Sequence, residues 1–140
     1  MKNPAPENSI SYQFSFPVEK KHLDALKHVN NVVYVQWIND ISEKHWNSIT
    51  TPELEKKYFW VVIRHEVDYL NQAVFGDTIT IFTWVGETHG VKSVRHVQIQ
   101  KGNEILVKAQ TTWCLIDAKV LKPTRIKEDI LQVLSAQKEQ

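Results

Sequence analysis

Hydrophobic and polar residues alternate along most of this chain with a period of two, which is typical of half-buried β-strands. Four segments have this pattern, and they span residues 10–16, 79–85, 91–99 and 105–115. A fifth strand is predicted at 58–70, because that segment is rich in β-branched and aromatic residues. Pro17 ends the first strand, and residues 86–90 are expected to form a loop. The sequence KGNE at 101–104 predicts a tight hairpin between the last two strands.

Only the segment from Asp24 to Trp46 has a long helical period. Its apolar stripe consists of Val29, Val33, Tyr34, Trp37, Ile38 and Ile41. A stripe this wide indicates a buried helix, and Asn30, a favourable N-cap, predicts that the helix begins near that residue. A short amphipathic helix is expected at 126–137, with Ile130, Leu131 and Leu134 facing inward.

The order of elements is therefore one strand, one long buried helix and four strands with mostly short connections, which favours antiparallel pairing. We predict an α+β fold in which a curved, five-stranded antiparallel sheet wraps around the helix. The length of 140 residues suits a single domain covering 1–140. Residues 1–8 are polar and are expected to be a flexible lead-in.

Composition narrows the range of functions. The net charge of +1 produces no strong electrostatic field that would attract nucleic acid or a membrane surface. The single Cys114 excludes an intramolecular disulfide. The first residues lack a signal-peptide core, and no apolar run is long enough to span a membrane. These features predict a cytoplasmic protein. Five tryptophans indicate large apolar surfaces, including a subunit interface that would cover an open sheet edge.

Asp24 is the first candidate for chemistry. It lies just before the predicted start of a buried helix, where backbone N–H groups lack helical partners and attract negative charge. A carboxylate at this point can take part in catalysis. It can equally be a cap or turn residue, with Asn30 and Asn31 serving only as a cap.

Three stretches resemble the hotdog fold, and within it the 4-hydroxybenzoyl-CoA thioesterase-like acyl-CoA thioesterases. Residues 24–37, DALKHVNNVVYVQW, are similar to the family pattern D-x-x-G-H-V-N-N-x-x-Y-x-x-W. Residues 68–77, DYLNQAVFGD, are similar to D-Y-L-x-P-A-x-x-G-D. The third stretch is TTWCLID at 111–117, followed by Lys122-Pro123. The resemblance covers roughly residues 10–135.

The resemblance implies that Asp24 is the catalytic carboxylate and that the backbone N–H of Asn31 polarises the thioester carbonyl. His28 and Asn30 would orient the turn or a water molecule, and Tyr34 would contact the substrate. The chain departs from the family pattern at Lys27, where the family usually has Gly. It also departs at His22, where the family often has a second Asp. Asn71-Gln72 replace the usual basic residue and Pro.

A basic segment near the C-terminus suggests a binding role. It contains Lys119, Lys122, Arg125 and Lys127, and no acidic residue lies between Asp117 and Glu128. The segment can be a solvated loop, or it can bind the phosphates of coenzyme A. Lys92 and Arg95 are further candidates for the phosphates.

Other chemistries are not supported. His65-Glu66 begins like the HExxH zinc motif, but Tyr69 replaces the second histidine, so no metal is expected. His65 suits a buried structural histidine better than a catalyst. The sequence has no G-x-S-x-G elbow and no glycine-rich phosphate loop. No cofactor is expected.

The favoured hypothesis is an acyl-CoA thioesterase, in which Asp24 acts as general base or as nucleophile through a mixed anhydride. An acyl-carrier-protein thioesterase is the alternative enzyme, and a non-catalytic acyl-CoA-binding hotdog protein is the alternative of another class. We expect a homodimer or homotetramer with the active site at the subunit interface.

Overall fold

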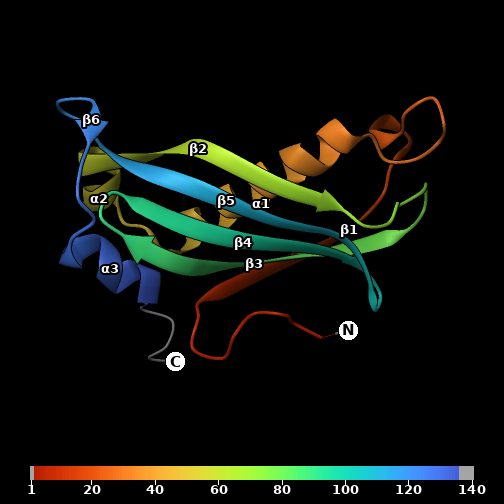
Figure 1. The fold of residues 1–140 in the computed structure, drawn as a ribbon, viewed down its shortest axis with the longest axis horizontal. Helices are drawn as coiled ribbons and strands as arrows, with labels where there is room; N and C mark the ends of the chain where they lie inside the picture. The colour runs from red at the N-terminus through yellow and green to blue at the C-terminus, as the bar shows by residue number, and fades with distance from the viewer. Residues whose placement is uncertain (1, 136–140) are drawn as a thin grey trace.

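The computed structural model describes residues 2–135 (Figure 1). Its strands are β1 (Ser11–Pro17), β2 (Tyr58–Tyr69), β3 (Thr78–His89), β4 (Lys92–Lys101), β5 (Glu104–Asp117) and the two-residue β6 (Lys122–Pro123). Its helices are the 3₁₀ turn η1 (Lys20–His22), α1 (Asn31–Ile49), α2 (Pro52–Lys57) and α3 (Glu128–Ser135). The five long strands and the long helix confirm the predicted α+β architecture.

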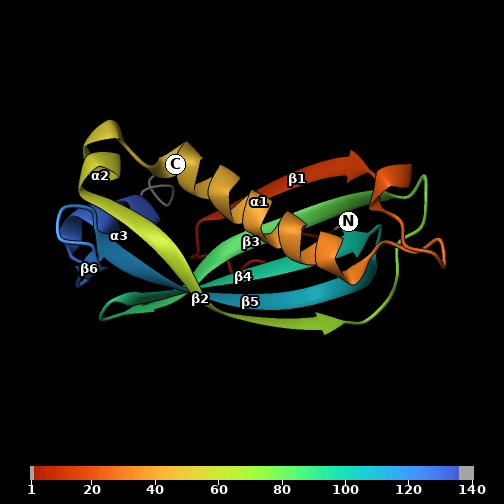
Figure 2. The ribbon, with the colours of Figure 1, turned by 90° about the horizontal axis from the view of Figure 1, so that it is seen from above.

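The sheet is antiparallel throughout, in the order β1-β3-β4-β5-β2, with β6 added beside β5. Figure 2 shows α1 lying along one face of this curved sheet. β2 does not pair with β3, the next strand in the sequence; it pairs with β5, from Tyr58 opposite Asp117 to Tyr69 opposite Val107. Residues 70–77 therefore cross one end of the sheet, and β1 and β2 form its two edges.

α1 begins where the sequence predicts. The side chain of Asn30 accepts a hydrogen bond from the N–H of Val32, and Asn31 is the first helical residue. The first half of the helix packs against the sheet through Tyr34, Trp37, Ile38 and Ile41, which are buried in the larger core. Burial of each large apolar side chain contributes about 1.5–3 kcal/mol, so this contact fixes the helix on the sheet.

A second core lies near the other end of α1. It consists of Leu54, Leu115, Ile126, Ile130 and Leu134, with Trp46 and Trp60 packed against it. α3 supplies Ile130 and Leu134 as predicted, but Leu131 is 38% exposed and does not face inward. The helix begins at Glu128 rather than at residue 126, and predicted residues 136–137 lie outside the described residues.

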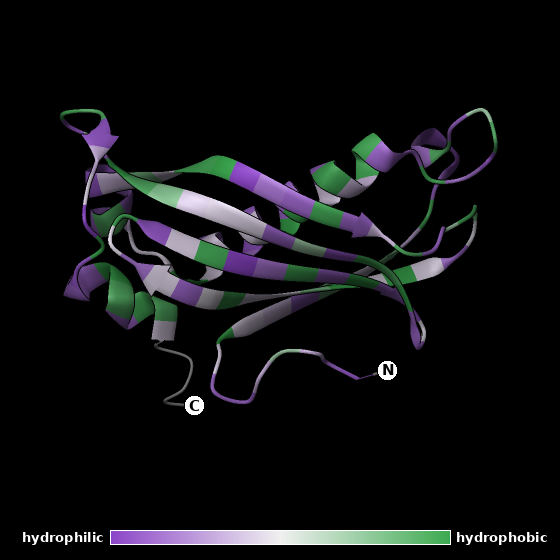
Figure 3. Cartoon of the chain, viewed as in Figure 1, coloured by the Kyte–Doolittle hydropathy of each residue, from purple (hydrophilic) through white to green (hydrophobic). Residues whose placement is uncertain are grey.

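The turns match the prediction in part. Gly102 has a φ of 58° between β4 and β5, which confirms the tight hairpin. Residues 86–89 continue β3 through a bulge instead of forming a loop. Gly86 leaves room there for the ring of His96, which would have to move if a Cβ stood at that position, since the two would lie 2.6 Å apart. Figure 3 shows the alternating hydropathy along β3 and β4 that predicted these strands.

Helices long and apolar enough for a membrane crossing do not occur in the described part of the chain.

Candidate active site

The loop before α1 folds back on itself. Asp24 donates its N–H to the carbonyl of His28 at 2.8 Å, and Lys27 donates its N–H to the carbonyl of Asp24 at 3.0 Å. Lys27 has a φ of 65°, in the left-handed region. Glycine adopts this conformation without a steric penalty, which explains why the family pattern has Gly where this chain has Lys.

The carboxylate of Asp24 holds this turn together. Its Oδ1 accepts hydrogen bonds from the N–H groups of Leu26 (2.9 Å) and His28 (3.2 Å). Asp24 is exposed, and its Oδ2 makes no hydrogen bond or ion pair within residues 2–135. One oxygen thus has a structural role in the turn, while the other is accessible to substrate or water.

The start of α1 leaves one backbone amide available. The N–H of Val32 is bound by the Asn30 side chain, and the N–H of Val33 donates to the Asn30 carbonyl at 2.8 Å. The N–H of Asn31 donates to no acceptor in the described residues. Asn31 is exposed, so this amide can bind a carbonyl oxygen, as the resemblance implies.

The second motif packs against the first. Val29 donates its N–H to the carbonyl of Ala73 at 3.0 Å, and His28 forms an isolated β-bridge with Val74. The N–H of Ala73 in turn donates to the hydroxyl of Tyr34 at 3.0 Å. Segments separated by more than 40 residues therefore converge at the start of α1.

Tyr34 was predicted to contact the substrate, but in the structure it is a buried core residue. Its side chain is 1% exposed, and its hydroxyl holds the 70–77 segment against α1. Burial raises the pKa of this hydroxyl, so it stays protonated. In this structure Tyr34 supports the site from the core.

The predicted phosphate contacts lie at the opposite end of the sheet (Figure 1). Lys122 lies in β6, opposite Asp117 at the end of β5 in the strand register, and Lys92 is the first residue of β4. The N–H of Ile126 donates to the carbonyl of Gly90, which brings the segment containing exposed Arg125 close to Lys92. The 19-residue helix α1 is about 28 Å long, so these cations lie far from Asp24 in the same protomer.

Arg95 is not a surface cation, which corrects its grouping with Lys92 and Lys122. It is 7% exposed, and its Nη1 donates to His45 Nδ1 at 2.7 Å and to Thr83 Oγ1 at 3.2 Å. Burial lowers the pKa of Arg95 to about 10, so it remains charged at neutral pH. Burial, together with this positive charge, lowers the pKa of His45 to about 3.

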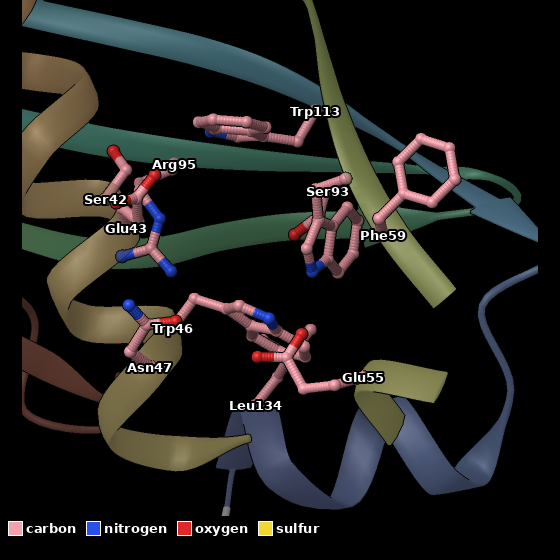
Figure 4. Close-up of a pocket in the computed structure, with 11 residues that line it drawn as sticks. Ser42, Glu43, Trp46, Asn47, Glu55, Phe59, Ser93, Arg95, Trp113 and Leu134 are labelled. Atoms are coloured by element: carbon pink, nitrogen blue, oxygen red, sulfur yellow. The ribbon is translucent and has the colours of Figure 1, made fainter. Parts of the chain in front are cut away.

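Arg95 belongs to a pocket that the sequence analysis missed (Figure 4). The pocket has a volume of about 270 Å³ and lies beside the second half of α1. It is lined by Ser42, Glu43, Trp46, Asn47, Glu55, Phe59, Trp60, Ser93, Arg95, Trp113 and Leu134. One feature of the sequence could have indicated the pocket. The polar residues Ser42 and His45 continue the buried stripe of the helix beyond Ile41.

The described residues contain no group of three or more histidine, cysteine, aspartate or glutamate side chains placed to hold a metal ion. Cys114 is buried.

Comparison with known proteins supports the resemblance. Residues 9–134 match the family model of the acyl-ACP thioesterase N-terminal domain. A chloroplast acyl-[acyl-carrier-protein] hydrolase from Cuphea viscosissima is 22% identical over 140 residues, which cover 92% of this chain and 34% of the relative. The chain thus spans about a third of that relative's length.

Two further proteins are similar over nearly their whole length. The long-chain acyl-CoA thioesterase FadM from Escherichia coli is 23% identical over 132 residues, covering 87% of this chain and 96% of FadM. A thioesterase structure with coenzyme A and zinc from Thermus thermophilus has a TM-score of 0.81 at 21% identity, covering 96% of this chain and 98% of that one.

The antiparallel sheet curled around α1 is the hotdog fold, as the sequence resemblance implied. With 126 consecutive residues matched to the family model, this chain belongs to the acyl-ACP thioesterase family, in the part described as its N-terminal domain.

Proposed function

We propose that this protein hydrolyses acyl thioesters, with acyl-CoA as its substrate, at the turn formed by Asp24 and Asn31. The observation that carries the proposal is the unbound N–H of Asn31 at the capped start of α1, next to a turn whose Asp24 Oδ2 is accessible. A free amide donor and a free carboxylate oxygen are the two groups that thioester hydrolysis requires.

In the proposed reaction, the thioester carbonyl oxygen accepts a hydrogen bond from the Asn31 N–H. Asp24 Oδ2 takes a proton from a water molecule, whose oxygen forms a bond to the carbonyl carbon. The C–S bond then breaks, and the thiolate receives the proton. In the nucleophilic alternative, Asp24 attacks the carbonyl carbon, the thiolate leaves, and water hydrolyses the resulting mixed anhydride. Asn30 fixes the helix start, and His28 fixes the turn through its backbone N–H.

We also propose that the active site is completed in a homodimer or a homotetramer. β2 is a 12-residue edge strand with Phe59, Ile63 and Tyr69 exposed. Exposed edges of this kind are suited to pairing with a second copy. Antiparallel pairing of two β2 strands about a two-fold axis would place the Tyr58 end of one protomer beside the Tyr69 end of its partner.

This pairing would bring together the two groups of predicted site residues, the basic segment and the Asp24 turn, which lie far apart within one protomer. The Tyr58 end lies by Asp117 and Lys122, whereas the Tyr69 hydroxyl donates to the carbonyl of Asn31 at 3.4 Å. The basic segment of one protomer would therefore approach the Asp24 turn of the other, where it can bind the phosphates of coenzyme A. Sedimentation showing only a 16.3 kDa species at micromolar concentration would contradict the dimer.

Two alternatives have specific support. The family description and the chloroplast relative favour an acyl-carrier-protein thioester as substrate. The use of Asp24 Oδ1 within the turn favours a non-catalytic binder, in which the carboxylate is only structural. FadM and the coenzyme A complex favour acyl-CoA.

A hydrolysis screen tests the proposal. The purified protein is incubated with matched acyl-CoA and acyl-carrier-protein thioesters of several chain lengths, and free thiol is measured. We expect faster release from acyl-CoA. Faster release from the carrier protein would select that substrate, and binding of acyl-CoA without release from any thioester would select the binder.

A further inference from the structure

We propose that the pocket beside the second half of α1 is a binding site for a carboxylate that carries a single aromatic ring or a compact apolar body. This site is separate from the Asp24 turn within a protomer, since Ser42 lies 11 residues, or about 16 Å, along the helix from Asn31. The proposal does not depend on thioester hydrolysis.

The first observation is a buried positive charge without a protein counter-charge. Arg95 takes part in no ion pair within residues 2–135. Its neighbour His45 accepts a hydrogen bond at Nδ1 and is therefore the neutral tautomer with its proton on Nε2. Because an uncompensated buried charge is unfavourable, a bound anion would stabilise this arrangement.

The second observation is a set of unused hydrogen-bond donors. Both hydrogen bonds that Arg95 makes leave from Nη1, so Nε and Nη2 have no acceptor in the described chain. Trp113 Nε1 is buried and also has no partner in that part of the chain. Figure 4 shows Arg95 extending from β4 toward the interior of the pocket. A carboxylate can accept two hydrogen bonds from one guanidinium, which matches these free donors.

The neighbouring hydroxyl groups do not supply the missing acceptor. Ser42 Oγ donates to the carbonyl of Ile38 at 2.8 Å, and Ser93 Oγ is hydrogen-bonded to Thr88 Oγ1 at 2.8 Å. Both hydroxyls are thus engaged with their own surroundings. The interior of the pocket is therefore rich in donors, and its natural complement is an acceptor with negative charge.

The walls determine the rest of the ligand. Trp46 and Trp60 meet edge to face, with ring centroids 5.6 Å apart and an interplanar angle of 87°. Phe59, Trp113 and Leu134 complete an apolar lining. Flat aromatic surfaces favour a flat or compact apolar body. A volume of about 270 Å³ lies just below the usual range for small-molecule pockets, which begins at about 300 Å³, and this points to one ring.

Two acids line the same pocket and oppose the ligand. Glu43 and Glu55 are exposed residues, and neither forms an ion pair with Arg95. Their charges would weaken the binding of an anion through solvent-screened repulsion. This leads to an unusual expectation: neutralising Glu55 should tighten carboxylate binding, whereas it should leave a neutral ligand unaffected.

Tryptophan fluorescence of the 140-residue chain tests the site, because Trp46, Trp60 and Trp113 line it. Benzoate and phenylacetate are titrated, with benzamide and benzyl alcohol as neutral counterparts. We expect the carboxylates to bind at least about tenfold more tightly than the neutral compounds. Equal affinity, or no binding of any carboxylate, would overturn the proposal.

Variants then assign the effect to Arg95. Arg95→Met removes the charge and keeps an unbranched side chain, and it should weaken benzoate at least about tenfold without weakening benzamide. Arg64→Met is the matched control, because Arg64 is an exposed arginine paired with Glu66. If Arg95→Met does not fold, Trp113→Phe and Glu55→Gln replace it. Benzoate should bind more weakly to Trp113→Phe and more tightly to Glu55→Gln. Unchanged benzoate affinity in Arg95→Met, or in both substitutes, would overturn the proposal.

Discussion

The two halves of α1 differ in what they bury. The first half packs Tyr34, Trp37 and Ile38 into the main core and begins at the turn with the thioesterase-like motif. The second half buries Ser42 and His45, and it lines a pocket with a charged residue inside. A buried apolar surface fixes a helix, whereas buried polar groups require partners and so mark places where a ligand can be accommodated.

The largest expected difference between the halves is in stability. Ile38 is fully buried, so Ile38→Ala should lower the free energy of unfolding by about 2–5 kcal/mol. Ser42→Ala should cost only about 1 kcal/mol, since its hydroxyl bonds a carbonyl of its own helix and the residue faces an existing pocket. Urea unfolding measures both variants. Equal losses would show that the second half is packed as tightly as the first.

The second half should also be sensitive to acid. An unfolded histidine titrates near pH 6.5, whereas burial holds the pKa of His45 to about 3 in the folded protein. As the pH falls below 6.5, the unfolded state therefore binds a proton that the folded state does not bind. The free energy of unfolding is highest above pH 6.5 and decreases as the pH falls toward 3. His45→Gln should flatten the dependence of urea unfolding on pH in this range by about 1–3 kcal/mol. An unchanged slope would mean that the pKa of His45 is not lowered in the folded protein.

In the turn before α1, Lys27 has a strained backbone conformation with a positive φ. Lys27→Gly should raise the free energy of unfolding by about 1 kcal/mol, because glycine adopts the positive φ at no steric cost. Lys27→Ala is the matched control: it also removes the charge but keeps the strain. Thermal melts that show the same gain for both variants would attribute the effect to charge instead.

The smallest expected effect concerns the basic segment. Replacing Lys122 and Arg125 with alanine should raise KM for acyl-CoA by roughly two- to tenfold at low salt, with little change in kcat, because exposed charges interact weakly and are screened. Lys108→Ala, which removes an exposed lysine of β5, should leave KM unchanged. An unchanged KM in the double variant would identify the segment as a solvated loop.

The parts predicted correctly from the sequence are those set by local pattern. Alternation identified four of the five long strands, and β-branched and aromatic content identified β2. Asn30 marked the start of α1 because capping is decided within a few residues. The pairing of β2 with β5 was not predicted, since strand order depends on how residues 70–77 cross the sheet. Leu131 was misplaced because it lies about 100° around α3 from Ile130, and only the stripe with Ile130 and Leu134 is buried.

The pocket shows a different limit. Arg95, Trp46, Trp60 and Trp113 come from α1 and three strands and share no sequence motif. Arg95 was treated as a surface cation because alternation alone does not tell which face of a central strand is covered by a helix. The proposed catalytic turn, in contrast, lies within eight consecutive residues, 24–31, and a pattern could reveal it.

The measurement that tests the central claim most directly is thioester hydrolysis by Asp24→Asn, with its melting temperature taken on the same sample. Asparagine can still accept the N–H bonds of Leu26 and His28, but it cannot take a proton or form an anhydride. We predict an almost unchanged melting temperature and a fall in kcat of at least about 100-fold, while Asp68→Asn, at an exposed acid of the second motif, keeps its activity. A folded Asp24→Asn protein that hydrolyses acyl-CoA at nearly the wild-type rate would contradict the account.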